Sequence, residues 1–485
     1  MIDSATVRRL ASLALCSALL AAPLQAQQSG GRADEDPEFL QLKPPPGSME
    51  DQIKAAQERM RGDVGAAQDR QAEEFAQLSE KMEAQYQGLV ERMAAQREQF
   101  HKRVAQQWTE VAESSQKKWV DYSDKTDARS TVDFEKGEVE VEVLIPVEEV
   151  APKKGAGATP DQLDAREQQK LRALAEEKIR KQTQKMLAEK EPEGEALAAS
   201  PEPESPPAPA PQAAPAPQAT PAPQATPAPQ ESAHAPASRA PGQPAARAKE
   251  QKPARKPAPV LSGQLRDKAG HPLTEKDAAR FVKEQELVVD PKPEVGEDGK
   301  ARIKVKVKVA MAPNHLKVRA DRYTKQINAQ ASRLGIDPAL VFAVIHTESS
   351  FNPLARSNVG AYGLMQLIPK AAAYEAYKHL YQDEKLVTPE YLYDPDNNIT
   401  LGATYLQMLD HAYFGKLKSP ENRQVLSIAA FNCGPTRVKR TVMKGEDVDG
   451  LSPEQVVALV QQRAPEETKN YVVRVRARMA LYRAQ

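Results

Sequence analysis

The stretch ESSFNPLARSNVGAYGLMQ, residues 348–366, decides how the C-terminal part of this 485-residue chain is interpreted. It opens with a carboxylic acid at the end of an apolar run, and Asn352-Pro353 then predicts the end of a helix. Gly360 and Gly363 allow close approach of the backbone before a Gly-Leu-Met-Gln turn closes the segment. A carboxyl in apolar surroundings, followed by such a turn, is suited to proton donation to a glycosidic oxygen.

The residues before Glu348 predict a helix that carries this carboxylic acid on its apolar face. Asp337 supplies an N-cap, and Pro338 takes the first helical position. Glu348 lies eight residues after Leu340 and four after Val344, so it shares their side of the helix. Burial on that side raises the pKa of a carboxyl, and a general acid needs that state. The alternative is a glutamate at a helix end that turns into solvent.

The rest of residues 313–485 shows helical periodicity and no alternating strand pattern. Further helices are predicted at 321–333, 370–381, 397–414, 420–431, 453–462 and 467–483. We therefore expect residues 313–485 to form one all-α domain.

Residues 1–26 have the features of a secretory signal peptide, which predicts a periplasmic location. The apolar core is too short to span a membrane, and cleavage is expected after Ala26. Cys16 raises the alternative of an outer-membrane lipoprotein. However, Leu15 is larger than the residue that lipid-modified signals prefer at that position, so Cys16 is assigned to the removed peptide. Residues 27–48 are expected to form a polar spacer.

Residues 49–111 predict a long amphipathic helix or a loose coiled coil. They contain no proline, and larger apolar residues recur at spacings of three and four. Gly62, Gly65 and Gly88 weaken this pattern. Self-association through this helix and packing of the helix on its own domain both remain open.

Two segments far apart in the sequence predict strands of one small α+β domain. Residues 132–145 alternate on both sides of Glu135-Lys136-Gly137, which is typical of a hairpin, and glutamates form its polar face. The segment RIKVKVKVAM, residues 302–311, carries lysines instead, and opposite charges suit neighbouring strands. With a charged helix near 160–190, the domain is expected to comprise residues 49–190 and 261–312.

Residues 191–260 predict a disordered Pro/Ala-rich linker. The repeats PAPQAA, PAPQAT, PAPQAT and PAPQES follow one another at residues 209–232, and such a polyproline-type segment cannot form a core. A spacer that extends the reach of a domain and an unselected insertion in a surface loop are both compatible with it.

The composition argues against several classes of function. The 67 basic and 67 acidic residues balance to zero, which gives no support for a nucleic acid partner. None of the seven histidines is paired at ligand spacing, so neither a metal nor another cofactor is expected. Without the signal peptide Cys433 is the single cysteine, which leaves no internal disulfide and, with no histidine motif beside it, no nucleophile.

The order of motifs after Glu348 closely resembles that of the soluble-type lytic transglycosylases, which have a goose-lysozyme-like helical fold and cleave peptidoglycan. The family pattern is a Glu-Ser pair, Asn-Pro, a downstream serine, Gly-Leu-Met-Gln, a Tyr-Asn element and a late tyrosine. The corresponding residues here are Glu348-Ser349, Asn352-Pro353, Ser357, Gly363-Leu364-Met365-Gln366, Phe431-Asn432 and Tyr471. The resemblance spans residues 313–485.

This resemblance implies that Glu348 is the single acid/base. It would protonate the β-1,4 bond between N-acetylmuramic acid and N-acetylglucosamine and then activate the muramyl 6-hydroxyl, which leaves a 1,6-anhydro end without water. The residues implied to bind the glycan strand are Ser357, Gly363, Leu364, Met365, Gln366, Phe431, Asn432 and Tyr471.

One residue departs from the family pattern, and two rival functions remain. Phe431 stands where the family has tyrosine, so a hydroxyl that orients the glutamate or the sugar is missing, unless Tyr471 supplies that contact. A lysozyme-type hydrolase would need a second carboxylate, for which Asp396 is the candidate. The other rival is a non-catalytic scaffold protein that binds peptidoglycan.

The upstream part resembles the murein transglycosylase C family, which places a small domain before the catalytic one. The segments WVDYSDKTDARSTVDFEKGEVEVEV, residues 119–143, and KVKVAMAPNHLKVRA, residues 306–320, carry this resemblance. The Pro/Ala-rich tract and the lack of a lipid-attachment motif depart from it, so the resemblance does not extend to membrane attachment.

Overall fold

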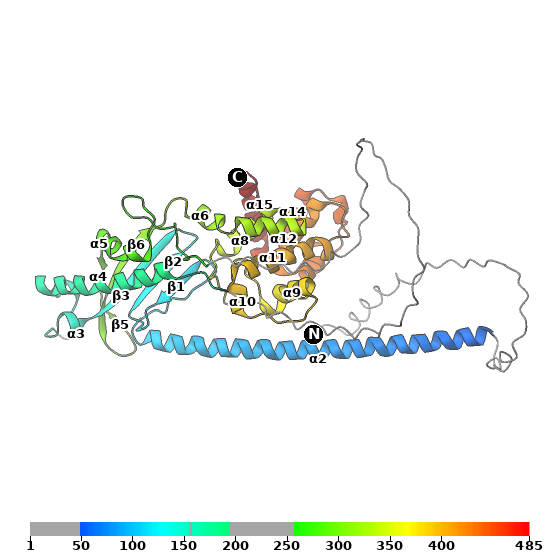
Figure 1. The fold of residues 1–485 in the computed structure, drawn as a ribbon, viewed down its shortest axis with the longest axis horizontal. Coiled ribbons are helices and arrows are strands. Elements are labelled where there is room, and N and C mark those ends of the chain that lie inside the picture. The colour runs from blue at the N-terminus through cyan, green and yellow to red at the C-terminus, as the bar shows by residue number, and fades with distance from the viewer. Residues whose placement is uncertain (1–48, 155–157, 194–256, 485) are drawn as a thin grey trace, which may run out of the picture. The chain divides into compact units, whose positions relative to one another are not determined.

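A computed structural model describes residues 49–154, 158–193 and 257–484. The chain divides into two compact units, one of residues 1–106 with 384–386 and the other of residues 107–383 and 387–485. The expected signal peptide, polar spacer and most of the Pro/Ala-rich linker lie outside the described residues. Figure 1 follows the chain through both units.

In the first unit the structure describes one long helix, α2 (Met49–Ala105). This confirms the predicted helix, which ends six residues earlier than expected. Lys102 and Arg103 stand in its last turn, where cations complement the helix dipole, and Lys102 pairs with Glu98 one turn before it at 2.6 Å. Within the described ranges, no helix is both long enough and apolar enough to cross a bilayer.

The second unit begins with an antiparallel sheet. Its strands are β1 (Lys118–Tyr122), β2 (Ala128–Asp133), β3 (Glu138–Pro146), β4 (Val288–Val289), β5 (Glu294–Val295) and β6 (Ala301–Ala310). The order is β1-β2-β3-β6-β4, and β5 also pairs with β6. The predicted hairpin is confirmed as β2-β3, and its turn uses the left-handed backbone of Gly137, with φ 68°.

The pairing of β3 with β6 confirms that the glutamate-rich and lysine-rich segments are neighbours. They run antiparallel across more than 150 residues of intervening sequence. Lys308 Nζ lies 3.0 Å from the carboxylate of Glu138, and Lys306 Nζ lies 3.6 Å from that of Glu140. Cross-strand pairs of opposite charge therefore line the polar face of the sheet.

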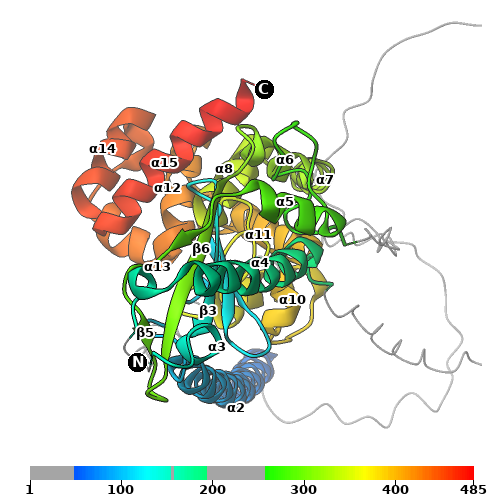
Figure 2. The same cartoon turned by 90° about the vertical axis from the view of Figure 1, so that its left-hand side faces the viewer.

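Helices cover the other face of this sheet. They are α3 (Val147–Val150), α4 (Ala165–Ala188) and α5 (Ala278–Glu284), and Figure 2 shows α4 lying across β3 and β6. A capping box starts α4, in which Asp164 accepts from the Glu167 amide and Glu167 accepts from the Asp164 amide. The helix buries Leu171 and Ile179 in the core with the valines of β3 and β6.

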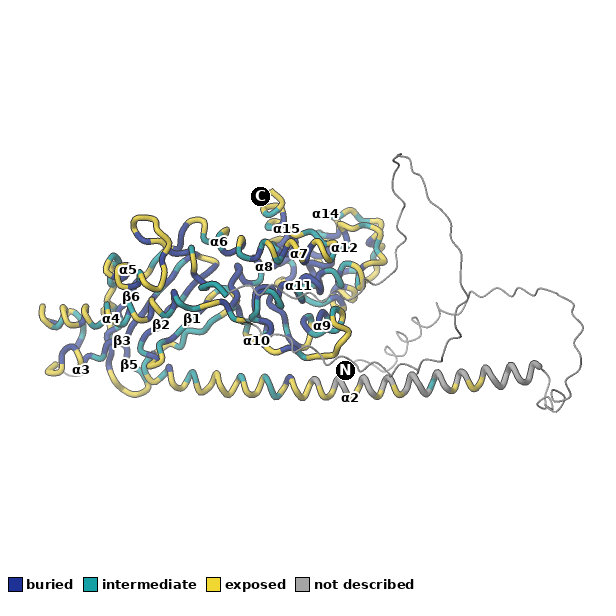
Figure 3. The backbone as a smooth tube through the Cα atoms, in the orientation of Figure 1, coloured by how far each residue is buried: buried dark blue, intermediate teal, exposed yellow. Residues whose placement is uncertain are grey.

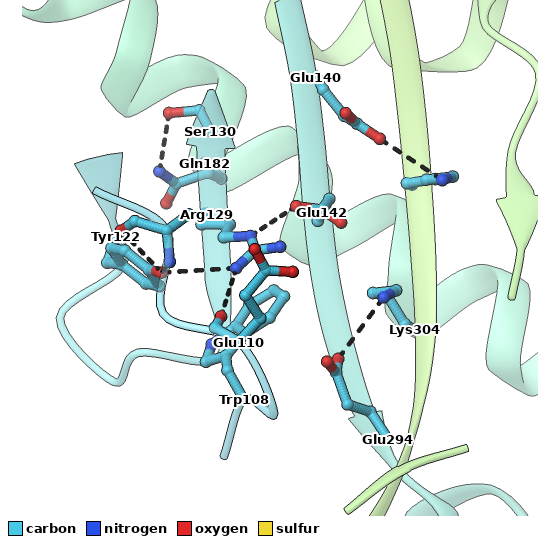
Figure 4. Close-up of polar contacts among 12 residues, drawn as sticks. Trp108, Glu110, Tyr122, Arg129, Ser130, Glu140, Glu142, Gln182, Glu294 and Lys304 are labelled. Carbon is cyan, nitrogen blue, oxygen red and sulfur yellow. Dashed lines mark hydrogen bonds and ion pairs between the residues drawn. The ribbon is translucent and has the colours of Figure 1, made fainter. Parts of the chain in front are cut away.

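A buried polar cluster fixes residues 108–110 against the sheet (Figure 4). Arg129 Nε donates to Glu142 Oε2 at 2.5 Å, and both side chains are about nine-tenths buried. The guanidinium also donates to the Glu110 carbonyl at 2.9 Å and lies over the Trp108 ring, 4.2 Å from its centroid. At the next position of β2, Ser130 Oγ accepts a hydrogen bond from Gln182 Nε2 of α4 at 3.2 Å. A buried guanidinium with a carboxylate, a carbonyl and a ring around it is well compensated.

The residues on each side of the 194–256 segment are joined by backbone pairing. Lys190 and Pro259 form an antiparallel bridge, and the Val260 amide donates to the Glu189 carbonyl at 2.8 Å. Glu191 is buried and accepts from the Tyr323 hydroxyl at 2.8 Å. The folded part therefore reaches a few residues past the expected linker limits at both ends.

The described residues after 313 contain helices and isolated bridges but no strand. The α-helices are α6 (His315–Asp321), α7 (Thr324–Leu334), α8 (Pro338–Ser349), α9 (Tyr374–Tyr381), α10 (Pro389–Tyr393), α11 (Pro395–Met408), α12 (Pro420–Cys433), α13 (Pro435–Arg437), α14 (Pro453–Arg463) and α15 (Glu466–Arg483). The six helices predicted in addition to the one that carries Glu348 are confirmed as α7, α9, α11, α12, α14 and α15, whereas α6, α10 and α13 were not predicted.

Five of these helices start in the same way, with a capping side chain followed by proline. The caps accept a backbone N–H of the first turn and are Asp337, Thr388, Asp394, Ser419 and Ser452. Proline fits the first helical position because its missing N–H would have no partner there. This local signal explains why the helix starts could be read from the sequence.

Helix α8 differs from the prediction because it has no solvent-facing side. None of its residues from Ala339 to Ser349 is exposed, and α7 and α15 pack against it. In Figure 3 it belongs to the dark blue interior of the helical region. The predicted apolar face, with Leu340 and Val344, is buried as expected, and the other sides of the helix are covered as well, so α8 is a central helix. It also ends at Ser349 rather than at Asn352, because Ser350 and Phe351 adopt left-handed backbone.

Candidate active site

Glu348 lies in the last turn of α8 and is half-buried. Burial raises the pKa of its carboxyl to about 7, because the charged form loses solvation. The nearby carboxylate of Glu467 raises the pKa further, whereas a hydrogen-bonding interaction with Tyr471 and the charges of Arg474 and Lys117 lower it. A carboxyl with this pKa can both donate and accept a proton near neutral pH.

Tyr471, on another helix, interacts with Glu348. It lies in α15, is buried, and has a pKa raised well above the ordinary value by burial and by the Glu348 carboxylate. Its hydroxyl interacts with the Glu348 carboxyl but makes no hydrogen bond of regular geometry with any residue that the structure describes. The phenol is therefore neutral, and its oxygen is left for a further partner.

The Gly-Leu-Met-Gln turn is attached directly to the end of α8. Ser349 Oγ donates to the Leu364 carbonyl at 2.8 Å and is fully buried. Gly363 has φ 73°, and a Cβ there would lie 2.2 Å from the Leu392 carbonyl oxygen, so only glycine fits. The turn is thus fixed in position next to the helix end that carries Glu348.

Asn398 of α11 holds the other side of the turn, and the sequence analysis did not include it. Its side chain is fully buried, accepts from the Met365 amide at 2.8 Å, and donates to the carbonyls of Tyr362 and Leu392 at 2.9 and 2.7 Å. Three partners saturate the amide almost completely. Asparagine in the first turn of a predicted helix gave no signal for this role.

Gln366 offers an unpaired acceptor at the end of the turn. It is 8% exposed and has left-handed backbone, with φ 49°. Its Nε2 donates to the Gly363 carbonyl at 2.9 Å, whereas its Oε1 is buried without a hydrogen-bond partner among the described residues. An unsatisfied buried oxygen costs free energy, which a ligand donor can recover.

The other residues predicted in this segment have mainly structural surroundings. Leu364 and Met365 are fully buried, and Met365 packs so tightly on Gly402 of α11 that a Cβ there would lie 2.3 Å from its sulfur. Ser357 Oγ accepts the Ala361 amide at 2.9 Å within its own loop. Leu364 and Met365 can therefore offer a ligand only their backbone.

Phe431 and Asn432 lie in the last turns of α12. The ring of Phe431 is half-buried and tilted against Tyr405, with centroids 5.8 Å apart. Asn432 Oδ1 accepts from Thr468 Oγ1 at 2.7 Å, and its Nδ2 donates to Glu467 at 3.4 Å. These contacts connect Asn432 to the turn of α15 that precedes Tyr471.

Asp394 and Asp396 lie at the start of α11. Asp394 caps α11 by accepting the Asn397 amide at 2.7 Å, as expected, and Asp396 is half-buried in the first turn of that helix. Across the described ranges, no three His, Cys, Asp or Glu side chains meet in an arrangement that could hold a metal ion. The residues that sequence reasoning missed near Glu348 are Lys117 and Arg474.

Two family models match the chain. Residues 325–450 match the transglycosylase SLT domain, and residues 84–156 match the N-terminal domain of membrane-bound lytic murein transglycosylase C. The first match contains Glu348, the Gly-Leu-Met-Gln turn, Phe431 and Asn432. The second contains the β2-β3 hairpin.

Curated relatives agree with these matches. Membrane-bound lytic murein transglycosylase C of Cronobacter sakazakii is 32% identical over 234 residues, which cover 46% of this chain and 63% of the relative. The protein of the same name from Yersinia pestis is 32% identical over 232 residues, with the same coverage. The chain therefore spans just under two thirds of the length of these relatives.

Solved structures similar to the chain include lytic transglycosylases. The 70 kDa soluble lytic transglycosylase of Escherichia coli is 30% identical, with 33% of this chain and 24% of that chain covered and a TM-score of 0.28. An inactive mutant of lytic transglycosylase Slt from Pseudomonas aeruginosa is 32% identical, with 33% and 23% covered and a TM-score of 0.28.

Proposed function

We propose that this chain, which carries a transglycosylase SLT domain and an upstream region of the murein transglycosylase C type, is a peptidoglycan lytic transglycosylase. The observation that carries the proposal is Glu348, a half-buried carboxyl with a pKa of about 7 at the end of α8, inside the matched domain. A goose-lysozyme-like topology of the helical region is part of the same proposal.

Glu348 supplies both proton transfers of the reaction. Its protonated carboxyl donates to the glycosidic oxygen, the bond from that oxygen to C1 of N-acetylmuramic acid breaks, and N-acetylglucosamine leaves with a new 4-hydroxyl. The carboxylate then accepts the proton of the muramyl 6-hydroxyl while that oxygen bonds to C1 of the oxocarbenium-like intermediate. Glu348 ends protonated, and the product carries a 1,6-anhydro end without consumption of water.

The surrounding residues bind and orient the glycan. Gln366 Oε1 and the hydroxyl oxygen of Tyr471, both buried without a regular hydrogen bond, are the acceptors best placed for hydroxyl or N-acetyl N–H groups of the sugar. Phe431 presents a ring against which a sugar can pack. Gly363, Leu364 and Met365 contribute backbone, whereas Ser357 and Asn432 shape the loops around the site.

The proposed location is the cell wall outside the cytoplasmic membrane, where peptidoglycan lies. The signal-peptide features of residues 1–26 support export, and the named relatives are membrane-bound proteins. Cys433 of the described chain is a free thiol, and its pKa is raised by burial, so it is kept as a packing residue. The proposal also includes self-association through α2.

Digestion of purified sacculi followed by mass analysis of the products tests the function. The proposal expects 1,6-anhydro-muramyl ends from the wild type and none from Glu348→Gln. Reducing muramyl ends would indicate a lysozyme-type hydrolase, and loss of activity in Asp396→Asn would then identify its second carboxylate. If the wild type releases nothing but still binds sacculi, the protein is a scaffold.

A further inference from the structure

The backbone immediately after Glu348 is strained at two successive residues. Ser350 has φ 52° and Phe351 has φ 59°, and neither is glycine. Left-handed backbone costs about 1 kcal/mol or more for each such residue, and it persists only where the surroundings over-determine it. The turn that ends α8, two residues beyond the catalytic carboxyl, is therefore held in place by other parts of the molecule.

Two hydrogen bonds hold this turn, one from α6 and one to the segment that precedes β1. Arg319 Nε donates to the Ser350 carbonyl at 3.0 Å, and Asn352 Nδ2 donates to the carbonyl of Gln116, just before β1, at 3.3 Å. Phe351 is fully buried between rings, stacked on Tyr323 at 6.3 Å between centroids. The strained turn is thus bound on its polar and its apolar side.

Arg319 links this turn to the sheet. It is 1% exposed, and besides Ser350 its guanidinium donates to the Phe134 carbonyl and to Gln264 Oε1, both at 2.8 Å. It also lies over the Phe134 ring, 5.1 Å from the centroid. Phe134 follows β2, and Gln264 lies in the segment that leads to α5, so one side chain joins both parts of the sheet region to the end of α8.

The charge of Arg319 makes this link unusual. Its described acceptors are the two carbonyls, the amide oxygen of Gln264, the sulfur of Met311 and the ring nitrogen of His315, and none of them is a carboxylate. Burial lowers the pKa of Arg319 to about 9, which leaves it charged at neutral pH. A buried charge without a counter-ion is costly, so a side chain that only filled space would be apolar.

We propose that Arg319 is a positioning residue for Glu348, through which the N-terminal sheet region fixes the strained Ser350–Phe351 turn and with it the catalytic carboxyl. This inference rests on the proposed function. It gives the small upstream domain a role in catalysis, as a part of the scaffold of the active site. Gln116 acts in the same direction through Asn352, and the adjacent Lys117 contributes its charge to the field around Glu348.

Arg322 provides a matched control for this test. It lies one turn further along the chain, donates to the carbonyls of Pro259, Val260 and Ser262, and pairs with Glu191 at 3.7 Å, so it is also bound to the segments next to the sheet. None of these contacts reaches the turn after Glu348. Arg319→Gln, Arg319→Lys and Arg322→Gln should be compared in the full chain, with anhydro-product formation as the assay.

Arg319→Gln should lower kcat by about 10- to 100-fold, since small displacements of a reacting group have effects of this size. KM should stay within about twofold, and so should the affinity for glycan fragments measured in a Glu348→Gln background. Arg319→Lys should recover part of the loss, and Arg322→Gln should keep kcat within about twofold. Equal kcat losses in Arg319→Gln and Arg322→Gln, or a loss in KM alone, would overturn the inference.

Ser350→Gly separates positioning from folding if Arg319→Gln does not fold. Glycine relieves the left-handed strain, so Tm should stay the same or rise, while the freer turn should lower kcat several-fold. Unchanged kcat in this variant would contradict the role of the turn. If the wild type itself forms no anhydro product, the proposed function fails; if it forms the product and these variants match it, only the positioning role fails.

Discussion

At the scale of single residues, the pKa of Glu348 should set the pH dependence of the proposed reaction. The carboxyl must be protonated to act as an acid, and its pKa is about 7, so the rate should fall as the pH rises through that value. Tyr471 lowers this pKa and Glu467 raises it. We expect Tyr471→Phe to move the falling limb to higher pH and Glu467→Gln to move it to lower pH.

Initial rates of product release from pH 5 to 9 check this prediction. Both variants can lower the absolute rate, since Tyr471 is proposed to bind the sugar, but only the position of the limb is compared. Shifts in the same direction for the two variants would contradict the assignment of Glu348 as the titrating acid.

The same carboxyl should reduce the stability of the folded protein at high pH. Its pKa is raised from 4.5 to about 7 on folding, so the folded state keeps a proton that the unfolded state loses. Between these values stability falls as pH rises. The free energy of unfolding of Glu348→Gln, taken relative to the wild type, should therefore rise by about 1–2 kcal/mol from pH 4 to pH 8, after allowance for partial exposure.

Urea unfolding of both proteins at the two pH values measures this difference. Other titrating groups change both proteins alike, so the comparison isolates Glu348. A constant difference between pH 4 and pH 8 would mean that the carboxyl has an ordinary pKa in the folded state.

Phe431 is the position at which the chain departs from the lytic transglycosylase motif pattern that it resembles. Its ring is half-buried against Tyr405, and tyrosine at this position would restore the hydroxyl of the family pattern. We expect Phe431→Tyr to raise kcat several-fold with little change in Tm. Phe431→Leu is the control that removes the ring, and it should mainly raise KM. Equal kcat for wild type and Phe431→Tyr would show that Tyr471 already supplies the needed contact.

At the scale of secondary structure elements, local chemistry made most helices predictable. Capping side chains followed by proline mark the starts of α8, α11, α12 and α14, and α10 carries the same signal but was too short to be predicted. The burial of α8 on all sides was not predictable, because it depends on helices that arrive more than 100 residues later, such as α15. The role of Asn398 was hidden for the same reason: its partners, such as Met365 and Tyr362, lie more than 30 residues away.

The Gly-Leu-Met-Gln turn offers a sharp test of this packing. Gly363→Ala combines left-handed backbone with a Cβ placed 2.2 Å from the Leu392 oxygen, whereas Gly445→Ala, at φ 76°, has no atom within 4 Å. Gly445→Ala should lower the free energy of unfolding by about 1 kcal/mol, which is the cost of the left-handed backbone alone. Gly363→Ala should lower it several times more, since the Leu392 carbonyl and Asn398 must move.

Denaturant unfolding of the two variants gives this comparison. Gly363→Ala should also lose activity, whereas Gly445→Ala should keep it. Similar costs for both substitutions would mean that the turn is not packed as tightly as the structure indicates.

At the scale of the whole molecule, the pairing of strands far apart in the sequence was predictable only where their side chains carry opposite charges. The glutamates of β3 and the lysines of β6 identified neighbouring strands across the intervening sequence. The candidate site was predictable in its residues, since Glu348, Gln366 and Tyr471 stood out by motif. The residues that hold the site in place were not predictable. The hydrogen bonds of Arg319 and Asn352 go to backbone carbonyls, including those of Phe134 and Gln116, and a backbone acceptor cannot be recognised from the residue type.

The last prediction concerns the Pro/Ala-rich tract. Lys190 and Pro259 are bridged, and Glu189 and Val260 share a backbone hydrogen bond, so the chain ends on the two sides of residues 194–256 lie next to each other. A segment between adjacent ends can be shortened at small cost in loop-closure entropy. Deletion of the four repeats at residues 209–232 should leave Tm and the activity on soluble glycan fragments unchanged.

Activity on intact sacculi then distinguishes the two interpretations of the tract. If it extends the reach of a domain into the wall, the deletion should lower the rate on sacculi by several-fold relative to soluble fragments. A scrambled sequence of the same length and composition is the matched control, and it should restore the rate because reach depends on length and stiffness. Equal rates for wild type and deletion on both substrates would favour an unselected insertion. A fall in Tm would contradict the closed arrangement of residues 189–191 and 258–260 on which the deletion is designed.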